Sequence, residues 1–123
     1  MNGSPDHVLL VEIGMGLDQH GQDITKAAVR ACQNAIRNNT LPGLKRLLPE
    51  GDPAHMRVHV RLAVPVDADK LDMEAVKAVF PYGRVSVAVT QGGMLAHSHS
   101  VLPDKGDRND LVYVVNAAVE VGW

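Results

Sequence analysis

Hydrophobic and polar residues alternate along four segments of the chain, and a period of two predicts β-strands. These segments are residues 7–13, 56–66, 85–90 and 111–121. In the first of them apolar side chains occupy both faces, which is typical of a strand that is covered on both sides. Gly14 and Gly16 follow this segment, and we expect them to end the strand.

Apolar residues at helical spacing predict two main helices. The first begins after Asp23, whose side chain is suited to cap it, and ends at Asn38-Asn39. The second covers residues 72–80, and a short helix or a single turn is expected over residues 43–48. Residues 94–110, rich in Ser, His, Gly and Asp, are expected to form a long loop, and loops of that length are either functional or mobile.

This order of elements, β-α-(α)-β-α-β-β, predicts an α+β fold: a two-layer sandwich with a four-stranded mixed sheet and two main helices on one face. We expect one domain over residues 1–123, with residues 1–6 flexible. The second sheet face is too apolar for a free surface and too charged for a core. A subunit interface is therefore favoured over a solvated face. Its polar residues are Glu12, Arg57, His59, Arg61, Ser86, Thr90, Asn116 and Glu120.

The composition of the chain mainly excludes certain classes of partner and structure. Aromatic residues make up 3% of the 123 residues and the net charge is −2, which argues against nucleic acid and anionic membranes as partners. The single cysteine, Cys32, excludes an intramolecular disulfide and is expected to be a small core residue. The first residues lack the pattern of a secretory signal, and no apolar run is long enough to cross a bilayer. A cytoplasmic location is expected.

The densest candidate chemistry lies between the first predicted strand and helix, in residues 14–30. Asp18, His20 and Lys26 are the candidate catalytic residues, with Asp18 or His20 as acid or base. Lys26 or Arg30 would hold a substrate carboxylate, so the predicted ligand is a small anion. The alternative is structural: Lys26 and Arg30 share a solvated helix face and pair with nearby carboxylates. The candidate ligand-binding residues are Gln22, Arg30, Gly92, Gly93, Asn116 and Glu120.

Other motifs carry less weight. Gly14-x-Gly16 matches the start of a dinucleotide fingerprint, but Gln19 stands at the third glycine position. Asp18, His20 and Asp23, joined by His97 or His99 of the long loop, are a minority alternative for a metal site, and no native metal is predicted. The sequence His97-Ser98-His99-Ser100 is read as a mobile lid or a fortuitous metal grip rather than a nucleophilic site. For Asn116 and Glu120, structural pairing with an arginine of the second predicted strand is favoured.

Several motifs resemble a family of conserved hypothetical proteins named after a Listeria locus, lin-zero-five-one-two. The longest is Gly14-x-Gly16-x-Asp18-x-His20-Gly21-Gln22-Asp23-x-Thr25-Lys26-Ala27-Ala28-x-Arg30-Ala31, and the others are Phe80-Pro81-Tyr82-Gly83, Gly92-Gly93 and residues 114–122. The resemblance implies a small soluble bacterial protein of unassigned activity. A looser likeness in architecture is to small trimeric α+β proteins with ligand clefts between subunits, including ring-opening amidohydrolases with Ser-Lys pairs.

The sequence therefore predicts a homo-oligomeric small-molecule-binding protein or enzyme with a polar cleft at residues 14–30. One alternative is a non-catalytic assembly protein, in which the same polar groups lock a subunit interface. A second is an amidohydrolase-like hydrolase of small cyclic amides. The sequence does not decide whether the protein is an enzyme, and it identifies no cofactor.

Overall fold

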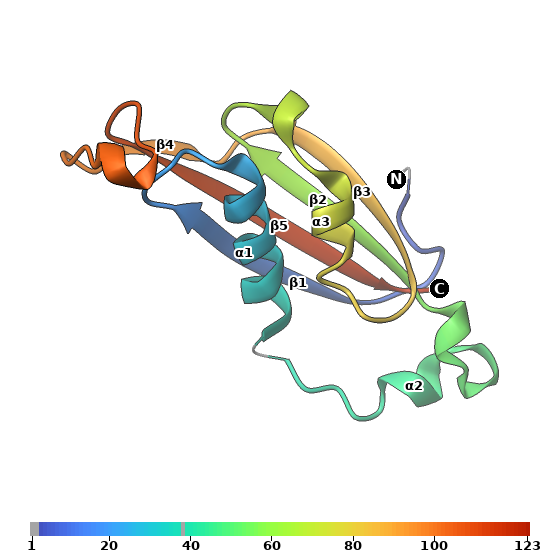
Figure 1. Ribbon diagram of the computed structural model, residues 1–123. Helices are drawn as coiled ribbons and strands as arrows, with labels where there is room; N and C mark the ends of the chain where they lie inside the picture. Colours follow the sequence, from blue (N-terminus) through green and yellow to red (C-terminus); the bar gives the residue numbers. More distant parts are fainter. Residues whose placement is uncertain (1–2, 38) are drawn as a thin grey trace.

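The computed structural model describes residues 3–37 and 39–123 (Figure 1). The first helix ends at Arg37, and Asn38, part of its predicted end, lies outside the described residues. The helices and strands are β1 (Val8–Asp18), α1 (Ile24–Arg37), α2 (Leu44–Leu47), β2 (Arg57–Val64), α3 (Met73–Lys77), β3 (Arg84–Gln91), β4 (Met94–His97) and β5 (Leu111–Gly122).

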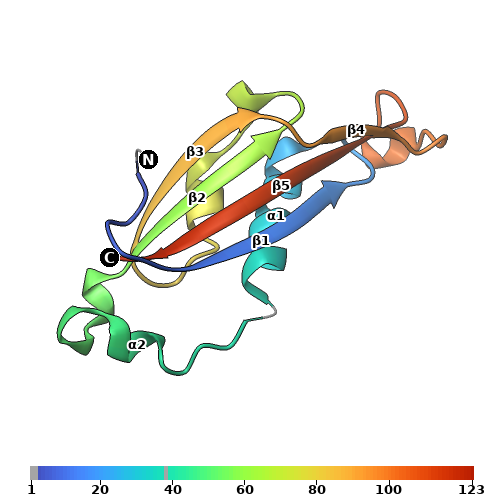
Figure 2. The same ribbon diagram turned by 180° about the vertical axis from the view of Figure 1, so that it is seen from behind.

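The strands form one mixed sheet in the order β1-β5-β2-β3, with β4 also paired to β5. β5 is antiparallel to β1, β2 and β4, while β2 and β3 are parallel and are joined through α3. α1 and α3 lie on one face of the sheet (Figure 1), and in the view from behind the strands lie in front of these helices (Figure 2). The α+β class, the mixed sheet and the placement of the main helices on one face are confirmed.

The sheet has five strands, whereas the sequence predicts four. The additional strand, β4, takes up the first residues of the segment expected to be a loop. β5 extends beyond the end of β2, so its backbone from Leu111 to Val114 needs another partner, and β4 pairs with these residues. This pairing anchors the rest of the long connection near the start of β5.

β1 continues through Gly14 and Gly16, which the sequence predicts to end it. The two glycines face α1, and their missing side chains let the helix backbone approach the strand closely. A Cβ atom at Gly16 would lie 2.1 Å from the backbone nitrogen of Ala31, and one at Gly14 would lie 2.3 Å from that of Ala35. These glycines are therefore packing residues within a strand, opposite the small residues of α1.

The core between helices and sheet is built mainly from Val, Leu, Ile and Ala side chains. Cys32 is fully buried in it, which confirms its predicted place, and burial raises the pKa of its thiol to about 12. The sequence predicts Glu12 on the face of the sheet that the helices leave uncovered, and this prediction is wrong. Glu12 lies on the helix-facing side of β1 with 8% of its surface exposed, on the same side as Gly14.

The other face of the sheet, here called the open face, has two parts. Val11, Ile13 and Met15 of β1 form an exposed apolar row, with exposed fractions of 55%, 69% and 52%. At the other part, Arg61 and Glu120 form an ion pair at 3.3 Å, one of the predicted pairings. Residues 3–6 lie beside this pair, where the Ser4 hydroxyl donates to Glu120 at 2.8 Å. Among the described residues no helix is long and apolar enough to cross a bilayer.

Candidate functional site

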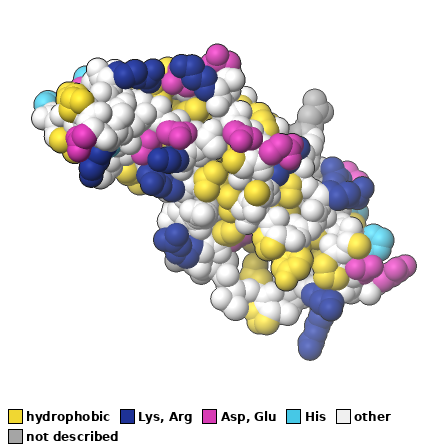
Figure 3. All heavy atoms as spheres, viewed as in Figure 1, with side chains coloured by type: hydrophobic (Ala, Val, Ile, Leu, Met, Phe, Trp, Pro, Cys, Tyr) yellow, Lys and Arg dark blue, Asp and Glu magenta, His cyan; other side chains and the backbone are white. Residues whose placement is uncertain are grey.

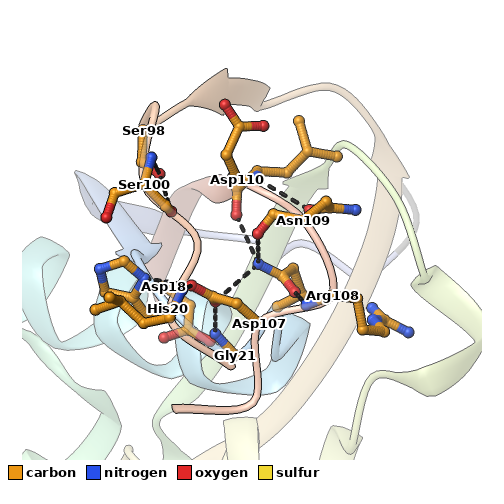
Figure 4. Close-up of polar contacts among 12 residues, drawn as sticks. Asp18, His20, Gly21, Ser98, Ser100, Asp107, Arg108, Asn109 and Asp110 are labelled. Carbon is orange, nitrogen blue, oxygen red and sulfur yellow. Dashed lines mark hydrogen bonds and ion pairs between the residues drawn. The ribbon is translucent and has the colours of Figure 1, made fainter. Parts of the chain in front are cut away.

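Asp107 joins the segment between β1 and α1 to the segment before β5 (Figure 4). Its carboxylate accepts hydrogen bonds from the backbone N–H of Gly21 at 2.6 Å and of Leu102 at 2.9 Å. His20 Nδ1 lies 2.6 Å from Oδ2, the oxygen that also accepts from Leu102, and the two side chains point toward one another. Only 1% of the Asp107 side chain is exposed. One carboxylate thus holds two chain segments together.

The surroundings of Asp107 determine its charge. Burial by itself raises the pKa of the carboxyl, but the hydrogen bonds from Leu102, His20 and Gly21, together with the charge of His20, hold this pKa well below its usual range. An ionised carboxylate can only accept, so His20 donates from Nδ1 and, while the ring is neutral, Nε2 is its proton acceptor. A carboxylate that orients an imidazole in this way gives it acid–base capacity.

Gln22 adds a second connection between the same segments. Its side-chain nitrogen donates to the Asp107 carboxylate at 3.1 Å and to the carbonyl of Leu111 at 3.0 Å. Its side-chain oxygen accepts from the backbone N–H of Arg108 at 3.0 Å. Gln22 is 5% exposed and has a φ of 48°, so the backbone adopts a left-handed conformation to bury this amide. Gln22 therefore fixes the position of the Arg108 backbone.

Beside this connection lies a pocket of about 400 Å³, called here the polar pocket. It is lined by Gly21, Gln22, Asp23, Ile24, Asp67, Lys70 and Arg108. The Tyr113 hydroxyl donates to Asp67 at 3.1 Å and accepts from Arg108 at 3.4 Å. Lys70 Nζ lies 3.9 Å from the other oxygen of Asp67. Two cations and two carboxylates thus line one hollow beside the start of α1.

Burial raises the pKa of the Tyr113 phenol, and the hydrogen bond to Asp67 raises it further. The phenol therefore remains protonated near neutral pH and continues to donate to Asp67. Because Tyr113 itself is 4% exposed, it supports the pocket from behind. Arg108 and Lys70 are both exposed, so their charged groups are open to solvent and to a ligand.

The candidate catalytic residues do not meet in this pocket. Asp18 is 4% exposed, and its carboxylate accepts from the backbone N–H of Asp23 at 2.8 Å and lies 3.5 Å from Arg30 Nη1. Asp23 caps α1 as predicted, accepting from the N–H groups of residues 25 and 26. Lys26 is exposed on α1, and among the described residues it forms no ion pair. The structure therefore gives Asp18 and Arg30 a part in holding the strand-to-helix turn.

The remaining candidate ligand-binding residues lie elsewhere. Gly92 and Gly93 connect β3 to β4, and Asn116 and Glu120 lie on the open face of β5. Of all the candidate residues, Gln22 alone appears in the lining of the polar pocket, together with the capping residue Asp23.

The histidines of the long connection are held by Asp110. His97 Nδ1 lies 3.0 Å from one oxygen of Asp110, and the N–H of His99 donates to the other at 3.2 Å. The hydrogen bond from His97 is the main reason that the pKa of Asp110 is lowered. Ser98 and Ser100 bond to each other. Within residues 3–37 and 39–123 no group of three or more His, Cys, Asp or Glu side chains is arranged to hold a metal ion.

Sequence reasoning missed Asp67, Lys70, Asp107, Arg108 and Tyr113. One local signal was present, because Asp107 and Arg108 belong to a polar run, residues 104–110, directly before the last predicted strand. Asp67 and Lys70 follow β2, and only the fold brings them beside the start of α1.

Comparison with known proteins agrees with the resemblance seen in the motifs. A family model described as "Conserved hypothetical protein (Lin0512_fam)" matches residues 8–121. The chain belongs to this family. As a member of the Lin0512 family it shares that description, which assigns no activity.

A solved structure extends this likeness to nearly the whole molecule. It is the crystal structure of an FtsZ-like protein of unknown function from Nostoc punctiforme. That protein is 40% identical to this Lin0512 family member, the match covers 97% of each chain, and the TM-score is 0.85. No curated protein matches the sequence.

Proposed function

We propose that the protein is a homo-oligomer that binds a small anionic molecule in the polar pocket. The observation that carries the proposal is the convergence of Arg108 and Lys70 on one hollow whose wall is fixed by Asp107 and Gln22. Ligand sites are commonly preformed hollows with a few well-placed polar groups. An arginine whose backbone is held in place is well suited to bind a carboxylate or a phosphate through its guanidinium group.

Asp67 and Asp23 limit which anions fit. Both carboxylates line the hollow, so an anion with no hydrogen-bond donor of its own would face two like charges. We infer a ligand that carries an anionic group for Arg108 and Lys70 and a hydroxyl or amino group for Asp67. His20, oriented by Asp107, provides acid–base capacity at the same end of α1. A cytoplasmic location belongs to this proposal and agrees with a single, fully buried cysteine.

Calorimetric titration tests the proposal. Inorganic phosphate, succinate, malate and serine are titrated into the wild type, into Arg108→Gln and into Lys70→Gln, with Arg46→Gln on α2 as a control. We expect malate or serine to bind more tightly than succinate, and each pocket variant to weaken binding about tenfold, as for a lost charged hydrogen bond. Equal binding by the wild type and both pocket variants would place the site elsewhere, and no binding by any probe would count against the proposal.

The homo-oligomer rests on a separate observation. The apolar row of Val11, Ile13 and Met15 is exposed along β1, and the exposed Met94 on β4 adds to the same face. Apolar patches of this kind mark interaction surfaces. We propose a second copy of the chain as the occupant, because the row lies beside the paired Arg61 and Glu120, whose two charges allow the same patch to meet itself.

Sedimentation velocity distinguishes this assembly from a solvated sheet face. The wild type is expected to sediment as a dimer or a larger species, and Ile13→Lys as a monomer. Val101→Lys, on an exposed apolar residue of the long connection, is the matched control and should leave the assembly intact. A monomeric wild type contradicts the interface. An assembly without any anion binding would favour the non-catalytic assembly protein as the function.

A further inference from the structure

A second hollow lies at the opposite end of α1 from the polar pocket. It has a volume of about 300 Å³. It lies between the sheet and the connection from α1 to β2, which contains α2 and is called here the arm. Its walls are mostly apolar, and Met56, Phe80 and Tyr82 line it. An outer hollow of about 470 Å³ shares Met56 and Tyr82 in its lining, so the two hollows are neighbours beneath the arm. Apolar side chains gather on this part of the surface (Figure 3). The inner space is called here the apolar hollow.

One acidic side chain stands in the wall of the apolar hollow. Glu12 projects from the helix-facing side of β1, and the side-chain amide of Asn39 donates a hydrogen bond to its Oε2. Among the described residues no other side chain bonds to this carboxyl, and no Lys, Arg or His pairs with it. Burial raises the pKa of Glu12, and the Asn39 bond only partly offsets this.

Such a carboxyl costs stability, since a buried charge with one amide donor and no cation beside it is unfavourable, and an apolar residue of similar size would pack at no such cost. Glu12 is also the single titratable carboxyl in the lining of the apolar hollow. Its surroundings suit a binding residue, because the carboxyl lies in the lining of a hollow, with Asn39 on one oxygen and the other oxygen open to a donor.

The aromatic residues indicate what the donor is. The sequence contains one Phe, two Tyr and one Trp, and two of these four, Phe80 and Tyr82, line the apolar hollow. Aromatic faces attract cations, and an ammonium group beside Glu12 stabilises the ionised carboxylate that burial alone disfavours. An anion would meet repulsion from Glu12. A neutral apolar molecule would leave the free oxygen of the carboxyl unpaired.

We propose that the apolar hollow binds a small amine with an apolar body, whose ammonium group donates to Glu12 while the body packs against Met56, Phe80 and Tyr82. Tyr82 is 66% exposed, so the hollow opens to solvent at its rim and a ligand can enter without unfolding the protein. This site is separate from the polar pocket and does not depend on the function proposed for it, because none of its lining residues is shared.

The test uses 2-phenylethylamine as the probe and 2-phenylethanol as its neutral counterpart. Both are titrated into the intact protein, and the methyl resonance of Met56 reports binding in the apolar hollow. We expect the amine to shift this resonance and to bind at least about tenfold more tightly than the alcohol, the preference given by a charge-assisted hydrogen bond. Arg108→Gln should bind the amine as the wild type does, which keeps this result independent of the polar pocket.

Glu12→Gln preserves the shape of the side chain and an oxygen for Asn39, and it should remove the preference for the amine. Glu74→Gln, on the exposed face of α3, is the matched control and should retain it. Tyr82→Ala at the rim provides a second variant that leaves the core intact, and it should weaken binding of both probes. Equal binding of amine and alcohol by the wild type, an unchanged Met56 resonance, or an amine preference that survives in Glu12→Gln would each overturn the proposal.

Discussion

The two ends of α1 use acidic residues in opposite ways. At the amino end Asp107 is buried, ionised and surrounded by donors, so its charge holds two chain segments together. At the carboxyl end Glu12 is buried with one donor, and burial favours its protonated form. The comparison shows that burial alone does not decide the charge of a carboxyl; the number and kind of donors around it decide. Hydrogen bonds to Asp107 thus fix the amino end of α1, while at the carboxyl end Glu12 has an oxygen that can accept from a ligand.

The largest effect is expected from disrupting the contact between β1 and α1, the helix whose two ends are compared. Gly16→Ala places a Cβ atom 2.1 Å from the Ala31 backbone nitrogen, and neither backbone can move without opening the core. We expect a loss of more than about 3 kcal/mol in the free energy of unfolding, because both partners in the clash are rigid backbone. Urea denaturation followed by circular dichroism measures it.

Gly43→Ala is the matched control for this prediction, because a Cβ at that position would have no atom within 4 Å other than those of its chain neighbours. Its stability should stay within about 1 kcal/mol of the wild type. A Gly16→Ala protein as stable as Gly43→Ala would show that β1 and α1 are less closely packed than the structure indicates.

The second prediction affects the amino end only. Asp107→Asn replaces an ionised acceptor by an amide that cannot accept on both sides, so the bonds from Gly21 and Leu102 weaken. We expect a lower Tm and faster hydrogen exchange at these two amides, while amides near Glu12 keep their wild-type rates. Asp104→Asn, exposed in the same connection, is the control. Uniformly faster exchange across both ends would show that they are not independent.

These features differ in how far the sequence predicts them. The buried faces of β2 and β5 follow from alternation, and the Asp23 cap follows from its place before an apolar helix. The full length of β1 does not, because a glycine that ends a strand and a glycine that admits a helix look alike in one sequence. The fate of Gly16 depends on alanines of α1 that contact it only in the folded state.

The polar pocket was less predictable, for a related reason. His20 and Asp107 are 87 residues apart, and Tyr113 and Asp67 are 46 apart, so no local spacing connects them. The sequence located the densest polar segment, but its acids were satisfied locally: Asp18 and Asp23 bond to the strand-to-helix turn itself. The residues left to face a ligand came from the connections after β2 and before β5.

The third prediction concerns the support behind the polar pocket. Tyr113→Phe removes the hydroxyl that lies between Asp67 and Arg108, and we expect a loss of about 1 kcal/mol in the free energy of unfolding. Arg108 also loses its partner, so anion binding should change while amine binding at the carboxyl end does not. Tyr82→Phe, at an exposed residue, is the control for stability. An unchanged anion affinity would mean that Tyr113 does not position Arg108.

The smallest expected effect is a difference in how the two carboxyls make stability depend on pH. The pKa of Glu12 is raised on folding, so its contribution to stability is greatest below its ordinary value near 4.5 and is lost as the pH rises through the folded value. The pKa of Asp107 is lowered, so its contribution is present above about 3.9 and is lost as the pH falls below that. Urea midpoints measured from pH 3 to pH 8 should therefore show Glu12→Gln gaining on the wild type as the pH rises. Over the same range the deficit of Asp107→Asn should narrow as the pH falls. A Glu12→Gln curve parallel to the wild type would mean that folding does not raise the pKa of Glu12, because Asn39 and solvent stabilise the carboxylate.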